Sequence, residues 1–157
     1  FKMNVLYHDQ FRNETLEKEL GAKKVELDTL LRESDFVSLH VNLTSETRHM
    51  ISTKQLEMMK PTAILVNTSR GPVIDEKALT AALKKGTIFG AGIDVYEEEP
   101  KMAPGLSKLP NAVLAPHLAS ATIETRNKMA TLAAENLISA LKGERPRHLV
   151  NPEAFQP

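Results

Sequence analysis

The 157-residue sequence contains no cysteine. This absence excludes disulfide frameworks, thiolate catalysis and zinc-thiolate sites, and it is compatible with a reducing compartment. Four of the five histidines are not spaced as in a metal site, and we interpret them as structural or surface residues. They are His8, His40, His49 and His148. We therefore predict no metal centre.

Net charge and long apolar runs are also lacking. The 20 basic and 20 acidic residues balance, so bulk electrostatics give no reason to expect nucleic acid or an anionic membrane as a partner. No apolar run reaches the length that spans a bilayer. The first seven residues turn polar too soon for a signal peptide. We expect a cytoplasmic protein that binds neither nucleic acid nor membrane.

Short apolar segments alternate with segments of helical period, and this alternation is typical of parallel strands joined by crossover helices. Val, Ile and Phe recur in the apolar segments, as in a sheet covered on both faces. The length suits one domain. The sequence therefore predicts an α/β fold with a doubly wound parallel sheet. Its strands are Met3–Tyr7, Phe36–Val41, Ala63–Asn67, Ile88–Ile93 and Ala112–Ala115.

Capping residues mark the predicted helices between these strands. Ser52 begins a capping-box spacing, which predicts a helix to about Met59. Asp75 is predicted to cap a helix over residues 76–85, and Gly86 is placed to end it.

The longest predicted helix runs from about Thr122 to Lys142, with Gly143 as its terminator. One of its faces is apolar, so we expect it to pack along the sheet. The segment beyond it is polar and punctuated by proline, which predicts an extended tail.

Polar side chains follow every predicted strand. In an open parallel sheet, ligands bind at the carboxyl ends of the strands. One arginine, several carboxylates and one histidine thus converge on a single edge of the predicted sheet, although they are scattered along the sequence. The residues concerned are Asp9, Asn42, Thr68, Ser69, Arg70, Asp94, Glu97, Glu98, Glu99 and His117.

Three stretches at this edge carry a family resemblance. They are Asn-Thr-Ser-Arg-Gly-Pro-Val-Ile-Asp at 67–75, Gly-Ala-Gly-Ile-Asp-Val-Tyr-Glu-Glu-Glu-Pro at 90–100 and Ala-Pro-His-Leu-Ala-Ser-Ala-Thr at 115–122. In order and separation they resemble the signature stretches of the D-isomer-specific 2-hydroxyacid dehydrogenases. The resemblance extends from Phe1 to about Pro152 and is closest to the glyoxylate/hydroxypyruvate reductase branch. It implies a Rossmann-like doubly wound parallel sheet.

The resemblance also implies roles for individual residues. Arg70 would anchor the substrate, Glu99 and His117 would form the acid-base pair, and Asp94 would hold the nicotinamide carboxamide. Asp9 would hold the adenosine ribose. Further cofactor contacts are implied for Asn42, Thr47, Thr68, Ser69 and Ala119.

The chemistry of these residue types agrees with those roles. The planar guanidinium of Arg70 can grip a 2-oxo-acid carboxylate with two hydrogen bonds. Imidazole is the side chain whose ordinary chemistry suits proton transfer in both directions, and Glu99 beside His117 would favour the protonated form that carbonyl reduction needs. We interpret Glu97 and Glu98 as solvated loop residues, because Glu99 alone directly precedes a proline.

The cofactor is predicted to be NAD, with NADP as the alternative. The carboxylate of Asp9 can accept both ribose hydroxyls and would repel a 2′-phosphate. Arg12 lies close in sequence and could soften this preference. Two positions depart from the family pattern: Asn42 stands where proline is usual, and Ala119 stands where glycine is usual.

One expected motif is absent. The sequence has no Gly-x-Gly-x-x-Gly, the loop that places backbone N–H groups against a pyrophosphate. We therefore expect a fragment whose sheet is split at its centre, with the missing strand between those that end at Tyr7 and Asn67. Residues 1–143 would form a partial dinucleotide-binding domain, and residues 144–157 would lead back toward an absent substrate domain. Turnover and cofactor affinity should then be low.

For the intact protein the sequence predicts reversible hydride transfer between NADH and a small 2-oxo acid, glyoxylate or hydroxypyruvate, to give the D-2-hydroxy acid. The resemblance implies a homodimer. The alternative is a non-catalytic dinucleotide sensor of the same fold that governs association with protein partners. A phospho-acceptor receiver domain is a third interpretation, but of its acidic cluster only Asp9 is found.

Overall fold

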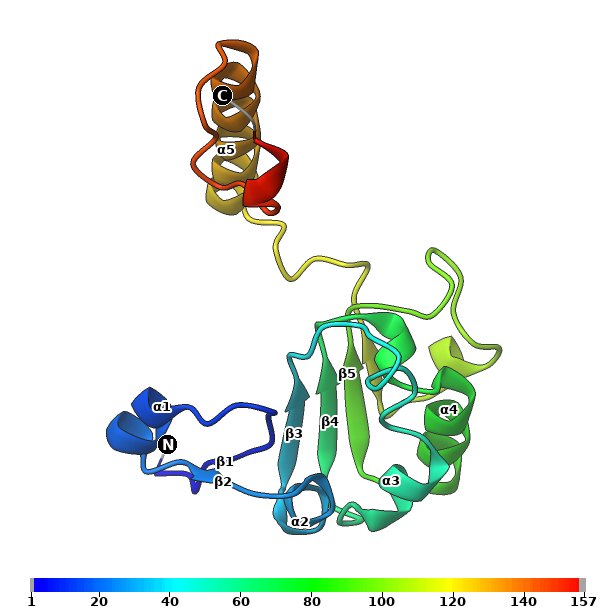
Figure 1. Cartoon of the computed structure of the whole chain (residues 1–157). Coiled ribbons are helices and arrows are strands. Elements are labelled where there is room, and N and C mark those ends of the chain that lie inside the picture. Colours follow the sequence, from blue (N-terminus) through cyan, green and yellow to red (C-terminus); the bar gives the residue numbers. More distant parts are fainter. Residues whose placement is uncertain (1, 156–157) are drawn as a thin grey trace. The chain divides into compact units, whose positions relative to one another are not determined.

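The computed structural model describes residues 2–155 (Figure 1). The chain divides into two compact units, one ending at Pro116 and the other beginning at His117. The first unit contains all the strands that the structure assigns in the described residues, and the second contains one long helix and a short tail. Each unit is described by itself below.

A four-stranded parallel sheet forms the centre of the first unit (Figure 1). Its strands, in spatial order, are β3 (Phe36–Leu39), β4 (Ile64–Asn67), β5 (Gly90–Ile93) and β6 (Ala112–Leu114). All four strands were predicted, and each is shorter than expected by one to two residues. The parallel order brings their carboxyl ends to one edge.

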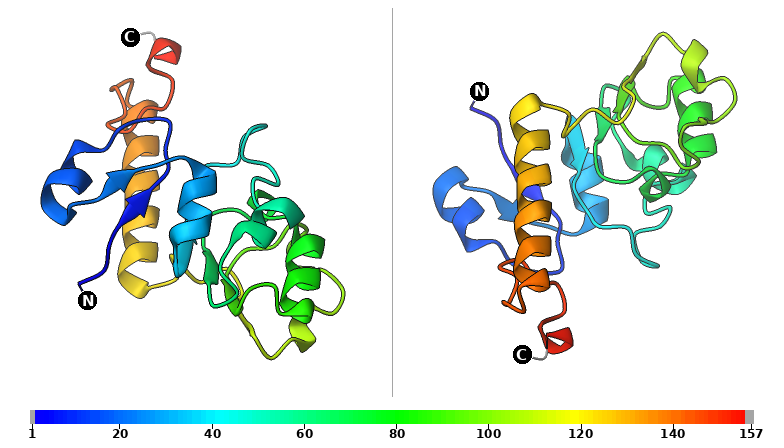
Figure 2. Two further views of the ribbon diagram at one scale, coloured as in Figure 1. Left: turned by 90° about the horizontal axis from the view of Figure 1, so that it is seen from below. Right: turned by 90° about the horizontal axis from the view of Figure 1, so that it is seen from above.

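The core lies on one face of this sheet. Val37, Leu65 and Ala91 are buried and stand side by side on neighbouring strands. They pack in one apolar cluster with side chains of α3 (Thr53–Met58) and α4 (Glu76–Lys85). Figure 2 shows α4, in green, alongside the strands from two further directions. The helix α2 (Leu27–Glu33) packs beside α3.

The opposite face of the sheet is open within this unit. Phe36 is 66% exposed and Val113 is 75% exposed. Successive side chains of a strand point to opposite faces, so these two residues fall on the face away from α3 and α4. Within residues 2–116, α3 and α4 cover one face, and the expectation of a sheet covered on both faces stays a prediction.

A separate two-stranded parallel sheet pairs β1 (Leu6–Tyr7) with β2 (Lys23–Lys24), which α1 (Glu14–Leu20) connects. The strand β2 was not predicted, because two exposed lysines give no apolar pattern. The expected split of the sheet is confirmed. The missing strand was predicted to lie beside the strand that ends at Asn67, which is β4. This position is wrong, because β3 and β5 occupy the two edges of β4.

The split lies between β1 and β3. A groove of about 920 Å³ runs there, and its lining includes Val5, Leu6 and Phe36. The carbonyls of Val5 and Tyr7 accept hydrogen bonds from the β2 side, so the backbone groups of the residues between them face the groove. The open edges of β1 and β3 therefore line the same groove. This is the arrangement expected of a parallel sheet from which one strand is missing.

The predicted helix boundaries in this unit are confirmed. Asp75 caps α4, because its Oδ1 accepts a hydrogen bond from the Ala78 N–H at 3.0 Å. Gly86 ends the helix in the left-handed conformation, with φ of 73°. At α3, the N–H of Ser52 donates to the side chain of Gln55 at 3.3 Å, as in a capping box.

The second unit contains α5 (Ile123–Leu141). Thr122 caps it by accepting a hydrogen bond from the Thr125 N–H, and Gly143 follows it with φ of 72°. Both ends agree with the prediction. The tail beyond contains the short 3-10 helix η3 (Pro152–Ala154). Packing of α5 along the sheet stays a prediction.

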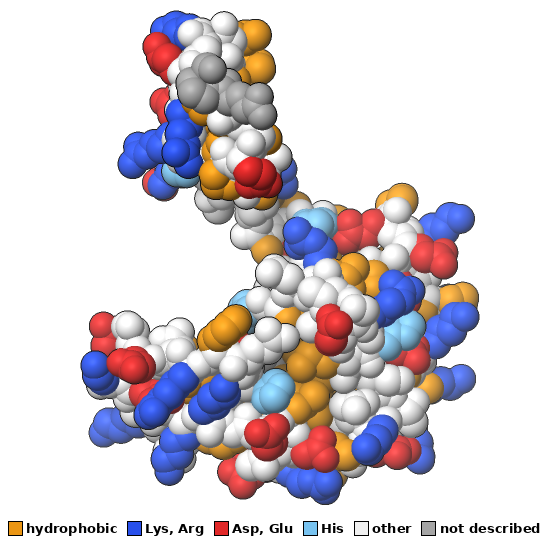
Figure 3. Space-filling model, in the orientation of Figure 1, with side chains coloured by type: hydrophobic (Ala, Val, Ile, Leu, Met, Phe, Trp, Pro, Cys, Tyr) orange, Lys and Arg blue, Asp and Glu red, His pale blue; other side chains and the backbone are white. Residues whose placement is uncertain are grey.

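The surface carries charges of both signs. In the view of Figure 3, acidic and basic side chains are interspersed over the first unit, as the balanced composition suggests. Across residues 2–155, the structure contains no helix that combines the length and apolar character needed to cross a bilayer.

Replacing Asp75 by Ala tests the cap of α4. The variant should lose about 1 kcal/mol of unfolding free energy at pH 7, because the Ala78 N–H loses its acceptor. The hydrogen bond from Ala78 lowers the pKa of Asp75, and the Ser52 hydroxyl and the nearby His49 act in the same direction.

The loss should depend on pH. A carboxyl group with a lowered pKa in the folded state stabilises the fold above its unfolded pKa, about 3.9, and this contribution disappears as pH falls through the folded value. Urea titrations should therefore show the full difference at pH 7 and a shrinking one below about pH 4. Asp28→Ala, in the first turn of α2, is the control and should change stability little. If the loss of unfolding free energy in Asp75→Ala stayed constant down to pH 2, the ionised carboxylate of Asp75 would not be what stabilises the helix.

Candidate functional site

The site is built from the ends of two adjacent strands. Asn67 at the end of β4 stands in register with Ile93 at the end of β5. The turn that carries Arg70 follows β4, and the loop that carries Asp94 and Glu99 follows β5. The structure therefore places these three predicted residues at one edge of the sheet.

Asn67 fixes the turn after β4. It is fully buried, and its Oδ1 accepts hydrogen bonds from the N–H and the hydroxyl of Ser69 at 3.0 and 2.9 Å. Its Nδ2 donates to the carbonyl of Arg70 at 3.0 Å. Every polar group of this amide is thus satisfied, as burial requires. The sequence carries no signal for this role of Asn67, because the last place on an apolar strand says nothing about burial.

Arg70 lies exposed on this turn, and its Nη1 donates to the carbonyl of Ser69 at 2.7 Å. That bond uses one of the five N–H groups of a guanidinium. Thr68 is exposed, whereas Ser69 is buried with both its N–H and hydroxyl bound to Asn67. Ser69 is therefore a structural residue of the turn, and its cofactor contact stays a prediction.

The loop after β5 is tied to both neighbouring strands. Asp94 is 6% exposed, and its N–H donates to the carbonyl of Asn67 at 3.0 Å. The Tyr96 hydroxyl donates to the carbonyl of Ala115 at 2.9 Å, beyond β6. Burial raises the pKa of Tyr96, and the nearby carboxylates of Asp94, Glu76 and Glu99 add to this rise. The loop is thus rigidly placed and acidic.

Two of the three consecutive glutamates are exposed. Glu99 is exposed, and its Oε1 accepts a hydrogen bond from the Tyr96 N–H at 3.1 Å, which orients the carboxylate. Glu98 is exposed, as expected of a solvated loop residue.

The interpretation of Glu97 as a solvated residue is wrong. Its side chain is only 21% exposed. Its Oε1 accepts a hydrogen bond from the Glu76 N–H at 2.7 Å, and its Oε2 lies 3.0 Å from Nε2 of His49. The N–H groups of the first helical turn lack partners within the helix, and the helix dipole favours an anion there. The start of α4 therefore binds this carboxylate.

Gly71 lets the two loops touch through their backbones. A Cβ built on Gly71 would overlap the carbonyl group of Tyr96 and lie 2.6 Å from the nitrogen of Glu97. No residue other than glycine fits this space without moving one of the loops. The contact lies directly beside Arg70 in the chain.

The residues predicted for the adenosine side lie in turns. Asp9 is exposed after β1, and its Oδ1 accepts a hydrogen bond from the Phe11 N–H at 2.9 Å. The Thr47 hydroxyl donates to the carbonyl of Asn42 at 2.6 Å and accepts from the Thr44 N–H at 2.8 Å. Asn42 and Thr47 thus close one turn after β3.

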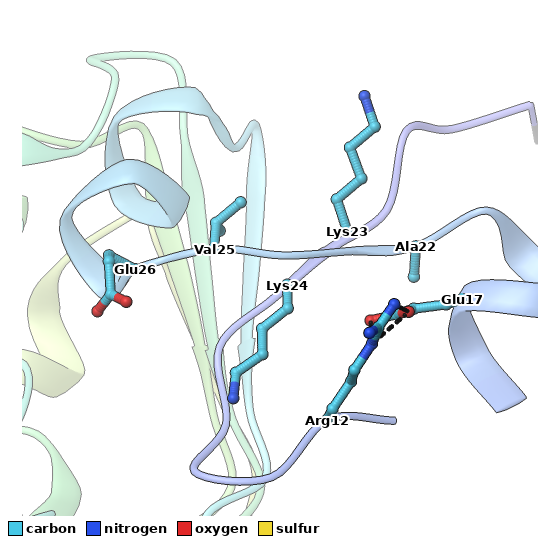
Figure 4. A pocket seen from close by; sticks show the side chains of 7 residues that line it. All are labelled: Arg12, Glu17, Ala22, Lys23, Lys24, Val25 and Glu26. Carbon is cyan, nitrogen blue, oxygen red and sulfur yellow. Dashed lines mark hydrogen bonds and ion pairs between the residues drawn. The ribbon is translucent and has the colours of Figure 1, made fainter. Parts of the chain in front are cut away.

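Arg12 has a partner of its own. A hollow of about 520 Å³ beside β2 is lined partly by Arg12 and Glu17, which face one another in Figure 4. The Arg12 Nη2 lies 2.7 Å from Oε2 of Glu17. The Arg12 hydrogen bond lowers the pKa of Glu17, and that of Tyr7 adds to the effect. The charge of Arg12 is therefore already paired with a carboxylate.

His117 and Ala119 belong to the second unit. His117 has a left-handed backbone with φ of 57°. Non-glycine residues in this conformation cluster at functional sites. The pairing of His117 with Glu99, and the place of Ala119 beside the cofactor, stay predictions.

The remaining histidines make local contacts. Nδ1 of His8 lies 3.0 Å from the carbonyl of Val25, and Nε2 of His40 lies 2.8 Å from the Ser38 hydroxyl. His49 contacts Glu97 as described above. Among residues 2–155, no cluster of three or more His, Asp or Glu side chains is arranged to hold a metal ion.

Residues 1–119 match the family model described as the D-isomer specific 2-hydroxyacid dehydrogenase, NAD binding domain. The chain belongs to this dehydrogenase family. The resemblance carried by the three signature stretches is confirmed. This is a family of oxidoreductases, and the part that the chain matches is the NAD-binding domain.

Similar members of this dehydrogenase family are known from archaea. The chain is 61% identical over 158 residues to a glyoxylate reductase of Korarchaeum cryptofilum and 56% identical over 155 residues to one of Thermococcus litoralis. Each match covers 99% of this chain and 47% of the relative. The chain thus spans about half the length of the curated relatives it matches.

A solved structure has the same fold. An NADPH-dependent glyoxylate/hydroxypyruvate reductase from Sinorhizobium meliloti, in complex with NADP and malonate, superposes with a TM-score of 0.90 at 32% identity. The superposition covers 99% of this chain and 48% of that one. The predicted Rossmann-like α/β fold class is confirmed.

Replacing Gly71 by Ala tests the contact between the two loops. The new methyl group must displace the Tyr96 carbonyl, so the variant should lose about 1 to 3 kcal/mol of unfolding free energy, as overpacked sites do. Gly92→Ala is the matched control, because a Cβ there would lie 3.8 Å from the Val66 side chain, an ordinary contact. Denaturant titrations that show equal stability for both variants would refute the close approach.

Proposed function

We propose that the protein that carries this chain reduces a small 2-oxo acid, glyoxylate or hydroxypyruvate, to the D-2-hydroxy acid with a nicotinamide dinucleotide. The observation that carries this proposal is the placement of Arg70 beside the acidic loop of Asp94 and Glu99, at the carboxyl ends of two adjacent strands. The names of the similar archaeal reductases support the choice of substrate.

Arg70 is suited to hold the substrate carboxylate. Its guanidinium is exposed, and one Nη1 hydrogen bond to its own turn steadies it. The remaining N–H groups can form two parallel hydrogen bonds to a carboxylate. Because the buried amide of Asn67 fixes the same turn, the anion would bind at a defined place.

His117 would act as the general acid. When the carbonyl carbon of the 2-oxo acid gains a hydride, the carbonyl oxygen gains negative charge and takes the proton of His117. Glu99 would hold the imidazole and favour its protonated form. In the reverse direction, neutral His117 would remove the hydroxyl proton as the hydride leaves the same carbon.

The residues at this edge fit a nicotinamide ring. The cofactor, when bound, supplies or accepts the hydride. Gly92 carries no side chain, and a Cβ there would meet only the Val66 side chain among the described residues, which leaves room for a flat ring. Asp94 beside it has a carboxylate that suits an amide N–H donor.

The charges near β1 support NAD as the preferred dinucleotide. Asp9 begins an exposed turn after β1, and the neighbouring cation of Arg12 is paired with Glu17. A carboxylate at this position accepts ribose hydroxyls and repels a phosphate. Asn42 and Thr47 would line the adenosine side of the same site, with Thr68, Ser69 and Ala119 as the remaining proposed cofactor contacts.

Further features of the intact protein are proposals from the sequence. Residues 1–143 would be part of its cofactor domain, and residues 144–157 would lead toward a substrate domain. A homodimer in the cytoplasm agrees with the family resemblance. The balanced charge supports the view that neither nucleic acid nor membrane is a partner.

The proposed reaction is tested by the oxidation of NADH, followed at 340 nm, by the protein that carries this chain. Glyoxylate should start the oxidation. His117→Ala should lower kcat by about 10²- to 10⁴-fold, the range for a general acid. His148→Ala, at another exposed histidine, should retain kcat. Full activity of His117→Ala would remove His117 from the mechanism, and no oxidation by the unchanged protein would favour the non-catalytic sensor.

The proposed cofactor preference is tested by Asp9→Asn. Loss of the carboxylate charge should reduce the ratio of kcat/KM for NADH to that for NADPH by about 10-fold, which corresponds to 1.4 kcal/mol. Glu19→Gln, which neutralises an exposed acid on α1, should leave the ratio unchanged. An unaltered ratio in Asp9→Asn would show that Asp9 does not discriminate between the cofactors.

A further inference from the structure

We propose that Glu97 is a positioning residue whose carboxylate fixes Arg70 and Glu99 relative to one another. The proposal rests on the proposed function, because it concerns the same site. Glu97, Glu76 and His49 form a network that we call the glutamate clamp, and it joins three segments that are distant in sequence.

Two glutamates of the clamp bind each other's backbone. The carboxylate of Glu97 accepts a hydrogen bond from the Glu76 N–H at 2.7 Å, and the carboxylate of Glu76 accepts one from the Glu97 N–H at 3.1 Å. Glu76 is 6% exposed, and its other oxygen accepts from the Ala103 N–H at 2.8 Å. The start of α4 and the loop after β5 are therefore held together from both sides.

His49 ties a third segment to this pair. Its Nε2 lies 3.0 Å from Oε2 of Glu97, and its N–H donates to the carbonyl of Pro72 at 2.8 Å. Its backbone is left-handed, with φ of 52°. The turn that contains Asn42 and Thr47 leads directly into His49. The clamp thus also anchors the loop that is proposed to line the cofactor site.

The clamp acts on the site through the backbone. The Tyr96–Glu97 peptide that it holds is the one against which Gly71 packs, and Arg70 directly precedes Gly71. The N–H of Tyr96, in the same loop, orients the carboxylate of Glu99. Movement of Glu97 would therefore shift both proposed catalytic side chains.

This arrangement explains why a carboxylate occupies position 97. It accepts hydrogen bonds at both oxygens, from a helix N-terminus and from an imidazole. Alanine provides neither acceptor. Glutamine provides one oxygen for the Glu76 N–H and an amide group that can face His49, so it should preserve much of the geometry.

The kinetic test uses the protein that carries this chain, with glyoxylate and NADH. Glu97→Ala should raise KM for glyoxylate by about 10-fold and lower kcat, because a displacement near 1 Å can cost about 10²-fold in rate. Glu97→Gln should restore KM to within about 3-fold of the unchanged protein. Glu98→Ala, at the adjacent exposed glutamate, should leave both constants unchanged.

The two constants separate positioning from simple loss of folded protein. A smaller folded fraction lowers the apparent kcat and leaves KM unchanged, whereas a displaced Arg70 raises KM. An unchanged KM in Glu97→Ala would overturn the proposal. A Glu97→Gln variant as impaired as Glu97→Ala would overturn it as well.

Hydrogen exchange tests the clamp independently of turnover. In Glu97→Ala, peptides that cover residues 70–79 and 94–103 should exchange faster, while peptides within β4 should keep their protection. If the unchanged protein does not oxidise NADH with glyoxylate, the proposed function fails and the exchange result still decides the clamp. Unaltered exchange in both loops would refute the clamp, even in an active enzyme.

Discussion

The contact between the backbone at Gly71 and the peptide that joins Tyr96 to Glu97 is the constraint on which the candidate site depends. Two parallel strands bring their ends to one edge, but the loops beyond them are free to diverge. Here they meet at a distance that only glycine allows. Arg70 and Glu99 flank this contact, so the backbone segments that carry them are held close together there.

Carboxylates of the same chemical type serve different purposes around this contact. Asp75 and Glu97 bind N–H groups in the first turn of α4, and Glu76 binds the loop in return. Glu99 is exposed beside them. Backbone N–H groups bind each of these structural carboxylates, and His49 also contacts Glu97. Glu99 is the carboxylate for which the acid-base role is proposed.

The residues proposed for the site are divided between two sheets. The β1–β2 pair carries Asp9, and the four-stranded sheet carries Arg70 and Asp94. Open strand edges on either side of one groove separate them. A dinucleotide that reached from Asp9 to Asp94 would have to contact both sheets, so the proposed site depends on how the two sheets are held together.

The sequence by itself determined the α/β class, four strands of the sheet, the ends of α3, α4 and α5, and the family. The periodicity of apolar residues, the capping residues and the spacing of motifs are local signals, so each can be read directly from the sequence. The lysine strand β2 has no such signal, which is why the position of the split was misplaced.

Only the tertiary structure decided which of three adjacent glutamates is structural and that Asn67 is fully buried. Glu97, Glu98 and Glu99 are identical as residues, and their roles differ because Glu97 meets the start of α4, 21 residues earlier in the chain. Burial and hydrogen-bond partners depend on segments that folding brings together. Local sequence patterns do not encode these contacts, because the contacts exist only after folding has brought the loops together.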